Sequence, residues 1–174
     1  MNRFSPVRFD PTAALTNAQV DTLLDAARLS PSAGNSQPWR FIAGLRGDGI
    51  HSRIIEHLAR SSAVWAPDAS LIVVNLTQTR VEDAPDWEYS EFSHYDLGQA
   101  VAHMTIQALA LGIAAHQFRA FDRDAVAAEF DVPPQFEVTS MTAFGSAAHK
   151  VGELASPGTS RERLSRADIT WTRD

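Results

Sequence analysis

The corner formed by residues 31–37, Pro31-Ser32-Ala33-Gly34-Asn35-Ser36-Gln37, gathers small hydrogen-bonding side chains and carries no charge. Pro31 and the following Pro38 fix the backbone that presents these side chains. Hydroxyl and amide groups on a rigid corner suit a neutral, heteroaromatic ligand that donates and accepts hydrogen bonds. The sequence therefore predicts a ligand-binding corner at 31–37.

Arginines cluster near both ends of the chain, with Arg3 and Arg8 at the start and Arg161 and Arg163 near the end. Arg makes bidentate hydrogen bonds to phosphate, so such clusters are informative in a chain of net charge −6. Two interpretations stay open at this point. The clusters are solvated tails, or, together with the corner, they bind the phosphate of a larger ligand.

Several kinds of chemistry have no residues to support them. The chain has no cysteine, which excludes disulfides, thiolate metal sites and thiol catalysis. Its histidines show no ligand spacing, since His51 and His57 fall on different helical faces, and we expect no metal site. Gly-x-Ser-x-Gly, P-loop and Rossmann glycine motifs are absent from the sequence, so a nicotinamide would be a transient reductant. The acidic balance argues against nucleic-acid binding.

The composition bounds the architecture. A chain of 174 residues with 44% hydrophobic and 21% charged residues is expected to form one globular domain over residues 1–174. The first residues, Met-Asn-Arg-Phe-Ser-Pro, lack the apolar core of a signal peptide, and we expect neither a membrane span nor membrane association. The cytoplasm is the expected compartment.

Hydrophobic periodicity predicts alternating helices and strands. Thr16 and Gln19 form a capping box before an amphipathic helix that ends ahead of Pro31. Residues 70–77 form a continuous apolar run that predicts a central strand covered on both faces. The other expected elements are strands at 39–45, 113–118 and 138–144, and helices at 50–58, 96–111 and 122–130. The helix at 96–111 is apolar almost all round and predicts a buried core helix, whereas residues 78–93 are expected to be an exposed loop.

The corner, extended to Trp39, resembles the PSxxNxQPW signature of the nitroreductase family of flavin enzymes. Arg3-Phe4-Ser5-Pro6 through Phe9 is similar to the RxSxRxF opening of that family. Further segments at 65–71, 95–100 and 116–122, together with Arg161-Glu162-Arg163, extend the resemblance over nearly the whole chain.

The resemblance implies an α+β fold, with a nitroreductase-like mixed central sheet flanked by helices. It also implies a homodimer with FMN at its interface, in which the C-terminal tail around Ile169–Trp171 reaches the partner subunit. Within this site the terminal arginines bind the flavin phosphate, and the backbone amides around Arg119 face N5 and O4 of the ring. The cofactor-binding residues implied are Arg3, Phe4, Ser5, Pro31, Ser32, Ala33, Asn35, Gln37, Gln117, Arg119, Ala120, Arg161 and Arg163.

The implied activity is reduction of nitroaromatic, quinone or related electrophilic small molecules by NAD(P)H. Hydride passes through flavin N5 in a ping-pong cycle. Because the flavin carries this chemistry, no catalytic side chain is expected.

Three positions depart from the family pattern. Val7 stands where many relatives carry Lys or Arg beside the pyrimidine edge, and Arg119 stands where Gly or Glu is common. Ser61 and Ser62 lie near the position of an Asn that hydrogen-bonds the ring in several relatives. The first two departures keep open an alternative function, a flavin-storage or flavin-sensing module without turnover; a dimer that binds no ligand is a third possibility.

The roles of four further side chains also stay open at this stage. Trp87, Tyr89 and Phe92 either pack on the surface or cover the ring. His116 is either a satisfied histidine at a strand end or a group beside the flavin loop.

Overall fold

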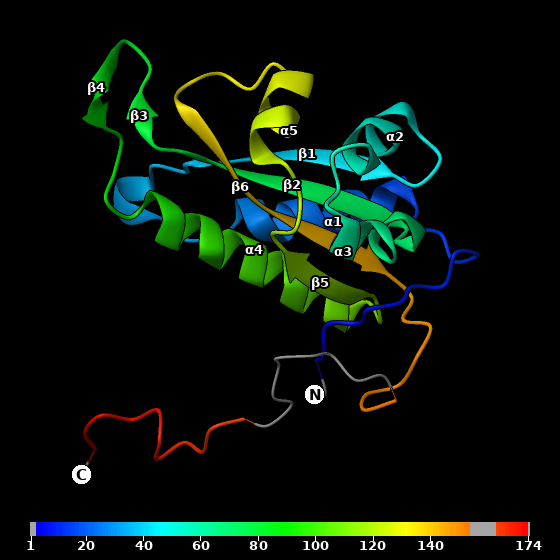
Figure 1. Cartoon of the computed structure of the whole chain (residues 1–174). Coiled ribbons are helices and arrows are strands. Elements are labelled where there is room, and N and C mark those ends of the chain that lie inside the picture. Colours follow the sequence, from blue (N-terminus) through cyan, green and yellow to red (C-terminus); the bar gives the residue numbers. More distant parts are fainter. Residues whose placement is uncertain (1–2, 154–162, 174) are drawn as a thin grey trace.

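The computed structural model describes residues 3–153 and 163–173, and their centre is a four-stranded sheet (Figure 1). Its strand order is β1-β2-β6-β5, with bounds β1 Trp39–Leu45, β2 Leu71–Gln78, β6 Phe136–Gly145 and β5 Ala114–Phe118. The α+β class is confirmed. The expected mixture of strand directions is not found in the described chain, where each pair in this sheet is antiparallel. One reason is that the segment between β1 and β2 returns the chain to the end of the sheet where β1 finishes.

Helices cover both faces of the sheet. On one face lie α1 (Asn17–Arg28) and α4 (Ser93–Ala110), and on the other lie α2 (Gly49–Ile55), α3 (Arg60–Ala63) and α5 (Arg123–Glu129). The capping box of α1 is present as predicted, with the Thr16 hydroxyl accepting from the Gln19 amide and Gln19 reaching back. The helix predicted at 50–58 ends earlier, and a short α3 that the sequence did not predict follows it.

The central strand β2 connects the two halves of the core. Its residues from Leu71 to Thr77 are all buried, which confirms the prediction of a strand covered on both faces. Because side chains alternate along a strand, Leu71 and Val73 pack towards α1 and α4, while Ile72 and Val74 pack towards the other helices.

The long helix α4 is buried on one side only. Leu97, Val101 and Met104 face the core, but Ile106 and Tyr95 are largely exposed. The prediction of a helix buried all round is therefore wrong for the single chain. The apolar residues on the outer side of α4 lack any cover among the described residues.

Residues 80–88 form a hairpin of β3 (Arg80–Val81) and β4 (Ala84–Glu88), which projects from the body in Figure 1. The loop expected at 78–93 is thus partly wrong. A two-stranded hairpin with exposed residues on both faces buries little apolar surface, so its sequence shows no alternation of apolar and polar residues.

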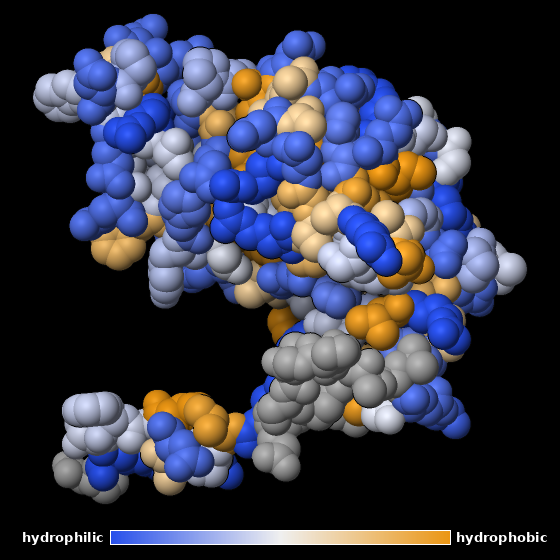
Figure 2. Space-filling view, viewed as in Figure 1, coloured by the Kyte–Doolittle hydropathy of each residue, from blue (hydrophilic) through white to orange (hydrophobic). Residues whose placement is uncertain are grey.

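The C-terminal segment 163–173 lies apart from the helices and sheet (Figure 1). All its residues are exposed, and Leu164, Ile169 and Trp171 place large apolar side chains on it. Figure 2 shows a small orange region on this separate arm. Isolated from the body, these side chains bury almost no area in one chain.

Candidate functional site

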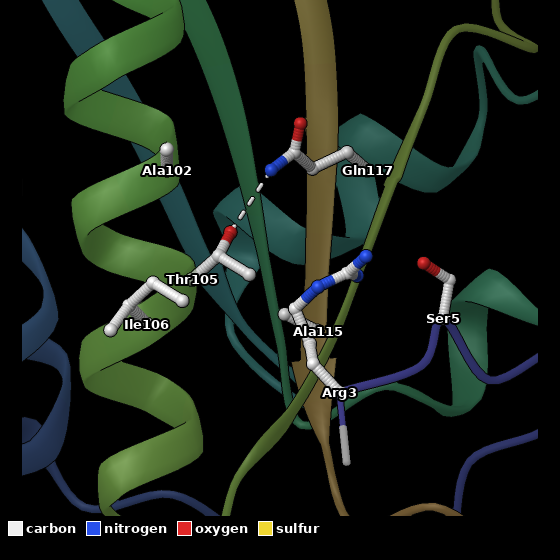
Figure 3. Close-up of a pocket in the computed structure, with 7 residues that line it drawn as sticks. All are labelled: Arg3, Ser5, Ala102, Thr105, Ile106, Ala115 and Gln117. Atoms are coloured by element: carbon white, nitrogen blue, oxygen red, sulfur yellow. Dashed lines mark hydrogen bonds between the residues drawn. The ribbon is translucent and has the colours of Figure 1, made fainter. Parts of the chain in front are cut away.

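A cleft of about 380 Å³ opens between α4, β5 and the N-terminal segment (Figure 3). Apolar side chains form part of its wall, and Arg3, Ser5 and Gln117 contribute the polar groups. The lining residues are Arg3, Ser5, Ala102, Thr105, Ile106, Ala115 and Gln117. The structure therefore brings together three of the residues that the sequence predicted: Arg3 and Ser5 from the N-terminal motif and Gln117 from the segment 116–122.

Strand alternation sends Gln117 into the cleft. Its side-chain amide donates to the Thr105 hydroxyl at 3.0 Å, and that hydroxyl donates to the Val101 carbonyl at 2.8 Å. This chain of hydrogen bonds fixes the Gln117 side chain against α4. The side-chain hydrogen bonds of the described residues include none to the Gln117 carbonyl oxygen.

The N-terminal segment that carries Arg3 and Ser5 is held along its length. Phe9 pairs with Ala147, and the Val7 amide donates to Nε2 of His149 at 3.1 Å. Phe4 packs edge-on against the His149 ring, and it lines a second cavity of about 320 Å³ that shares Arg3 with the first. These contacts place Phe4 in a cavity next to the cleft, and its role in cofactor binding stays a prediction.

His116 belongs to the other face of β5. Its Nδ1 donates to the Pro6 carbonyl at 2.7 Å, and its ring stacks on Trp65 with centroids 4.4 Å apart. Burial lowers the pKa of His116, and the hydrogen bond to Pro6 partly opposes that shift. The geometry favours the satisfied histidine over a group that reacts with a ligand.

The 31–37 corner has a strained and well-bonded backbone. Asn35 and Gln37 have φ of 56° and 48°, in the left-handed region that non-glycine residues rarely adopt. The Ser32 hydroxyl accepts from the Gln37 amide at 3.0 Å, and the buried Asp96 carboxylate accepts from the Ala33 amide at 3.0 Å. Such strain persists where surrounding contacts fix the backbone, and it is common at ligand sites.

The corner has both exposed and buried polar groups. Pro31 and the Asn35 side chain are exposed. The buried hydroxyl of Ser36 has no hydrogen-bond partner among the described residues. Tyr89, whose role the sequence left open, donates its hydroxyl to the Ser36 carbonyl at 2.8 Å, so this side chain joins the hairpin to the corner.

Within one chain the corner and the cleft are separate. The corner contacts α4 at Asp96, near its N-terminus, while the cleft is centred on Thr105. At about 1.5 Å of rise per residue these two positions lie about 13 Å apart along the helix. No described cavity is lined by residues of both.

The loop after β5 carries Arg119 and Ala120. Arg119 is exposed and Ala120 is half-buried. Among the described residues, no protein group accepts a hydrogen bond from either backbone amide, whereas the Ala120 carbonyl accepts from the Ala59 amide at 3.0 Å. This loop, two residues after Gln117 of the cleft, therefore offers two backbone donors.

The C-terminal arginines are not joined to the cleft within the described part of the chain. Arg163 is exposed on the separate segment, and no described cavity includes both it and Arg3. Arg161 lies outside the described residues. The role of both in phosphate binding stays a prediction.

Sequence reasoning missed the residues that α4 contributes to the cleft. Thr105, Ala102 and Ile106 were included in a helix expected to be wholly buried. The one sequence signal for the cleft was a threonine between apolar residues. That signal is weak, because a helical threonine commonly donates its hydroxyl to a backbone carbonyl one turn earlier, as Thr105 does to Val101.

Two further features of the described residues bear on function. No three His, Asp or Glu side chains gather there as metal ligands would. None of the helices described has the length and apolarity needed to cross a bilayer.

The fold and the cleft define a class: an α+β protein whose central helix, edge strand and N-terminal arginine surround a cavity suited to an anionic, partly apolar ligand. The model of the nitroreductase family matches residues 1–146, and the chain belongs to that family.

Individual relatives agree with this assignment over shorter stretches. The oxygen-insensitive NAD(P)H nitroreductase of Salmonella typhimurium is 33% identical over 87 residues, covering 48% of this chain and 40% of that protein. The major NAD(P)H-flavin oxidoreductase of Aliivibrio fischeri is 36% identical over 58 residues, covering 33% of this chain and 26% of that protein. The chain thus matches less than half the length of either relative.

A solved oxidoreductase containing FMN superimposes with a TM-score of 0.79 at 28% identity, covering 85% of this chain and 75% of that one. This match extends the likeness over most of the chain.

Proposed function

We propose that this protein is an FMN-dependent oxidoreductase that uses NAD(P)H to reduce nitroaromatic, quinone or related electrophilic small molecules. The observation that carries the proposal is the cleft in which Arg3, Ser5 and Gln117 meet, with the amides of Arg119 and Ala120 close by in sequence. We further propose that residues 1–174 act as one domain and work in the cytoplasm.

The residues of the cleft fit the parts of FMN. Arg3 supplies a permanent positive charge for the phosphate, and Ser5 and Gln117 supply neutral hydrogen-bonding groups. Ala102, Ile106 and Ala115 form apolar walls suited to a planar ring. The amides of Arg119 and Ala120 are donors that lack a described protein acceptor.

When bound, FMN would supply the redox chemistry, by taking a hydride from NAD(P)H at N5 and passing it to the electrophile. The protein's own residues then bind, orient and exclude water. Gln117, fixed by Thr105, would contribute a side-chain amide to ligand binding, and Ala102, Ile106 and Ala115 would contact the apolar part of the ring. No side chain needs to act as acid, base or nucleophile for this role.

A second copy of the chain would complete the site. The corner contacts α4 at Asp96 and lines neither cavity of its own chain, and the outer side of α4 leaves Tyr95 and Ile106 exposed. A homodimer that buries this side would bring the corner of one subunit to the cleft of the other. The C-terminal segment, with its exposed Trp171, would cover the partner and carry Arg161 and Arg163 to its phosphate site.

The experiment is an anaerobic absorbance measurement on purified protein with bound flavin. NADH and NADPH are added separately, and a quinone or nitroarene follows. We expect the flavin absorbance to bleach with a nicotinamide and to return with the electrophile, faster than for free FMN at equal concentration.

Bound flavin that neither nucleotide bleaches would contradict the oxidoreductase and support the storage or sensing module. Protein that is colourless and gains nothing from added FMN would support the dimer without ligand.

A further inference from the structure

In the turn at residues 119–122 the carbonyls of Arg119 and Ala120 accept hydrogen bonds, whereas their backbone amides have no acceptor among the described residues. The Phe121 amide donates to the Arg119 carbonyl at 3.1 Å, which closes a tight turn directly after β5. In a planar trans peptide the carbonyl and the amide hydrogen point in opposite directions. The bond to the Arg119 carbonyl therefore leaves the Ala120 amide directed away from this contact.

Ser62 anchors the next peptide of the same turn. Its side chain is 1% exposed, and its hydroxyl lies within hydrogen-bond distance of the carbonyls of Ala120 and Ala59. The Ala120 carbonyl also accepts from the Ala59 amide at 3.0 Å. The carbonyl side of the turn is thus held by residues 59–62.

Residues just before Ser62 also bond to this turn. Leu58 pairs with Phe121, and the Asp122 amide donates to the His57 carbonyl at 2.9 Å. The segment 57–62 and the turn 119–122 are consequently joined by both backbone and side-chain contacts. The Ser62 hydroxyl is the side-chain group that bonds across this connection.

We propose that Ser62 is a positioning residue, which orients the amides of Arg119 and Ala120 towards the ring of the bound flavin by holding the Ala120 carbonyl. This inference rests on the proposed function. It also gives Ser62 a different role from the Asn of several relatives, because its short side chain is used within the protein and does not reach the ring directly.

The chain offers a matched control for this role. Ser70 is 2% exposed, and its hydroxyl donates to the Ala13 carbonyl at 2.8 Å, away from the cleft. Ser62→Ala and Ser70→Ala therefore delete the same group from equally buried sites that bond a backbone carbonyl. The expected losses of folding stability are similar.

The test measures the dissociation constant, visible spectrum and reduction potential of riboflavin on both variants and on the wild type. Riboflavin lacks the phosphate, so it reports on ring and ribityl contacts alone. We expect Ser62→Ala to weaken riboflavin about 3- to 10-fold, the range for one misplaced hydrogen bond, and to shift its absorption maximum and potential. Ser70→Ala should leave all three at the wild-type values.

The outcomes separate this inference from the proposed function. Wild type that binds flavin, with Ser62→Ala equal to Ser70→Ala, overturns the role of Ser62 alone. Wild type that binds no flavin overturns both. If Ser62→Ala does not fold, Ser62→Cys keeps the shape with a much weaker donor, and the same comparison applies to it.

Discussion

Arg3 brings a positive charge to a cleft whose other described lining residues are neutral. Its position could be predicted from the sequence, because the segment from Arg3 to Phe9 resembles the opening motif of the nitroreductase family. Gln117 could be placed for the same reason. Thr105 could not, since in sequence it is one threonine of an apolar helix and only the packing of α4 against β5 places it in the wall of the cleft.

Replacement of Arg3 by Ala should weaken FMN binding about 10- to 100-fold, because a charge-assisted hydrogen bond contributes roughly 1.5–3 kcal/mol. Arg161→Ala and Arg163→Ala should do likewise if the partner's tail reaches the phosphate.

Fluorescence quenching at one salt concentration measures binding of FMN and riboflavin. Riboflavin affinity should stay unchanged, as should FMN affinity in Arg28→Ala, which removes an exposed arginine paired with Asp25 on α1. Equal losses for both ligands would indicate structural damage instead.

At the scale of elements, the strands with strong apolar runs were predicted most closely. The bounds of β1 match the prediction at 39–45, and β2 lies within one residue of it at each end. The β3–β4 hairpin and α3 were missed because both are short and mostly exposed, so tertiary contacts and not periodicity determine them. The contact of Ser62 was missed for the same reason, because its hydroxyl bonds the Ala120 carbonyl, 58 residues further along the chain.

The packing of α2 predicts a dependence of stability on pH. His51 on α2 is 4% exposed, and its Nε2 has no described partner. Burial lowers the pKa of His51 from its ordinary value of 6.5; Asp48 opposes this shift and Arg46 adds to it.

As the pH falls, the unfolded chain thus binds a proton at His51 at a higher pH than the folded chain does. Stability should be complete above about pH 6.5 and should fall on acidification towards the folded-state pKa, by at most about 1.4 kcal/mol per pH unit for this group. Urea unfolding at pH 7.5 and 5.5 checks this. His51→Leu should lose less stability over the same interval, and an unchanged loss would assign the effect elsewhere, with His116 the next candidate.

At the scale of the whole molecule, the exposed apolar side of α4 and the C-terminal segment are the two features that the proposed second subunit would cover. Single-sequence periodicity cannot distinguish a helix buried within its own chain from one buried by a partner. For this reason the sequence predicted α4 as a core helix, although it is only half covered in one chain.

The proposed dimer predicts the effect of a charge on this side of α4. Tyr95→Arg, at a residue 65% exposed, should raise the dimer dissociation constant at least about tenfold, equivalent to about 1.4 kcal/mol, and should release flavin as subunits separate. Val64→Arg is the control, since Val64 is 77% exposed between α3 and η2 (Ala66–Asp68). Light scattering over a dilution series measures both. A monomer that retains flavin at low concentration would contradict the composite site.

The central claim is that the cleft binds FMN, and the identity of the released cofactor tests it most directly. Protein purified without added flavin is heated, and the released material is separated by chromatography beside FMN, FAD and riboflavin standards. We expect a yellow protein that releases FMN and no FAD. Recovery of FAD or a deazaflavin alone, or a colourless protein that does not bind added FMN, would contradict the assignment.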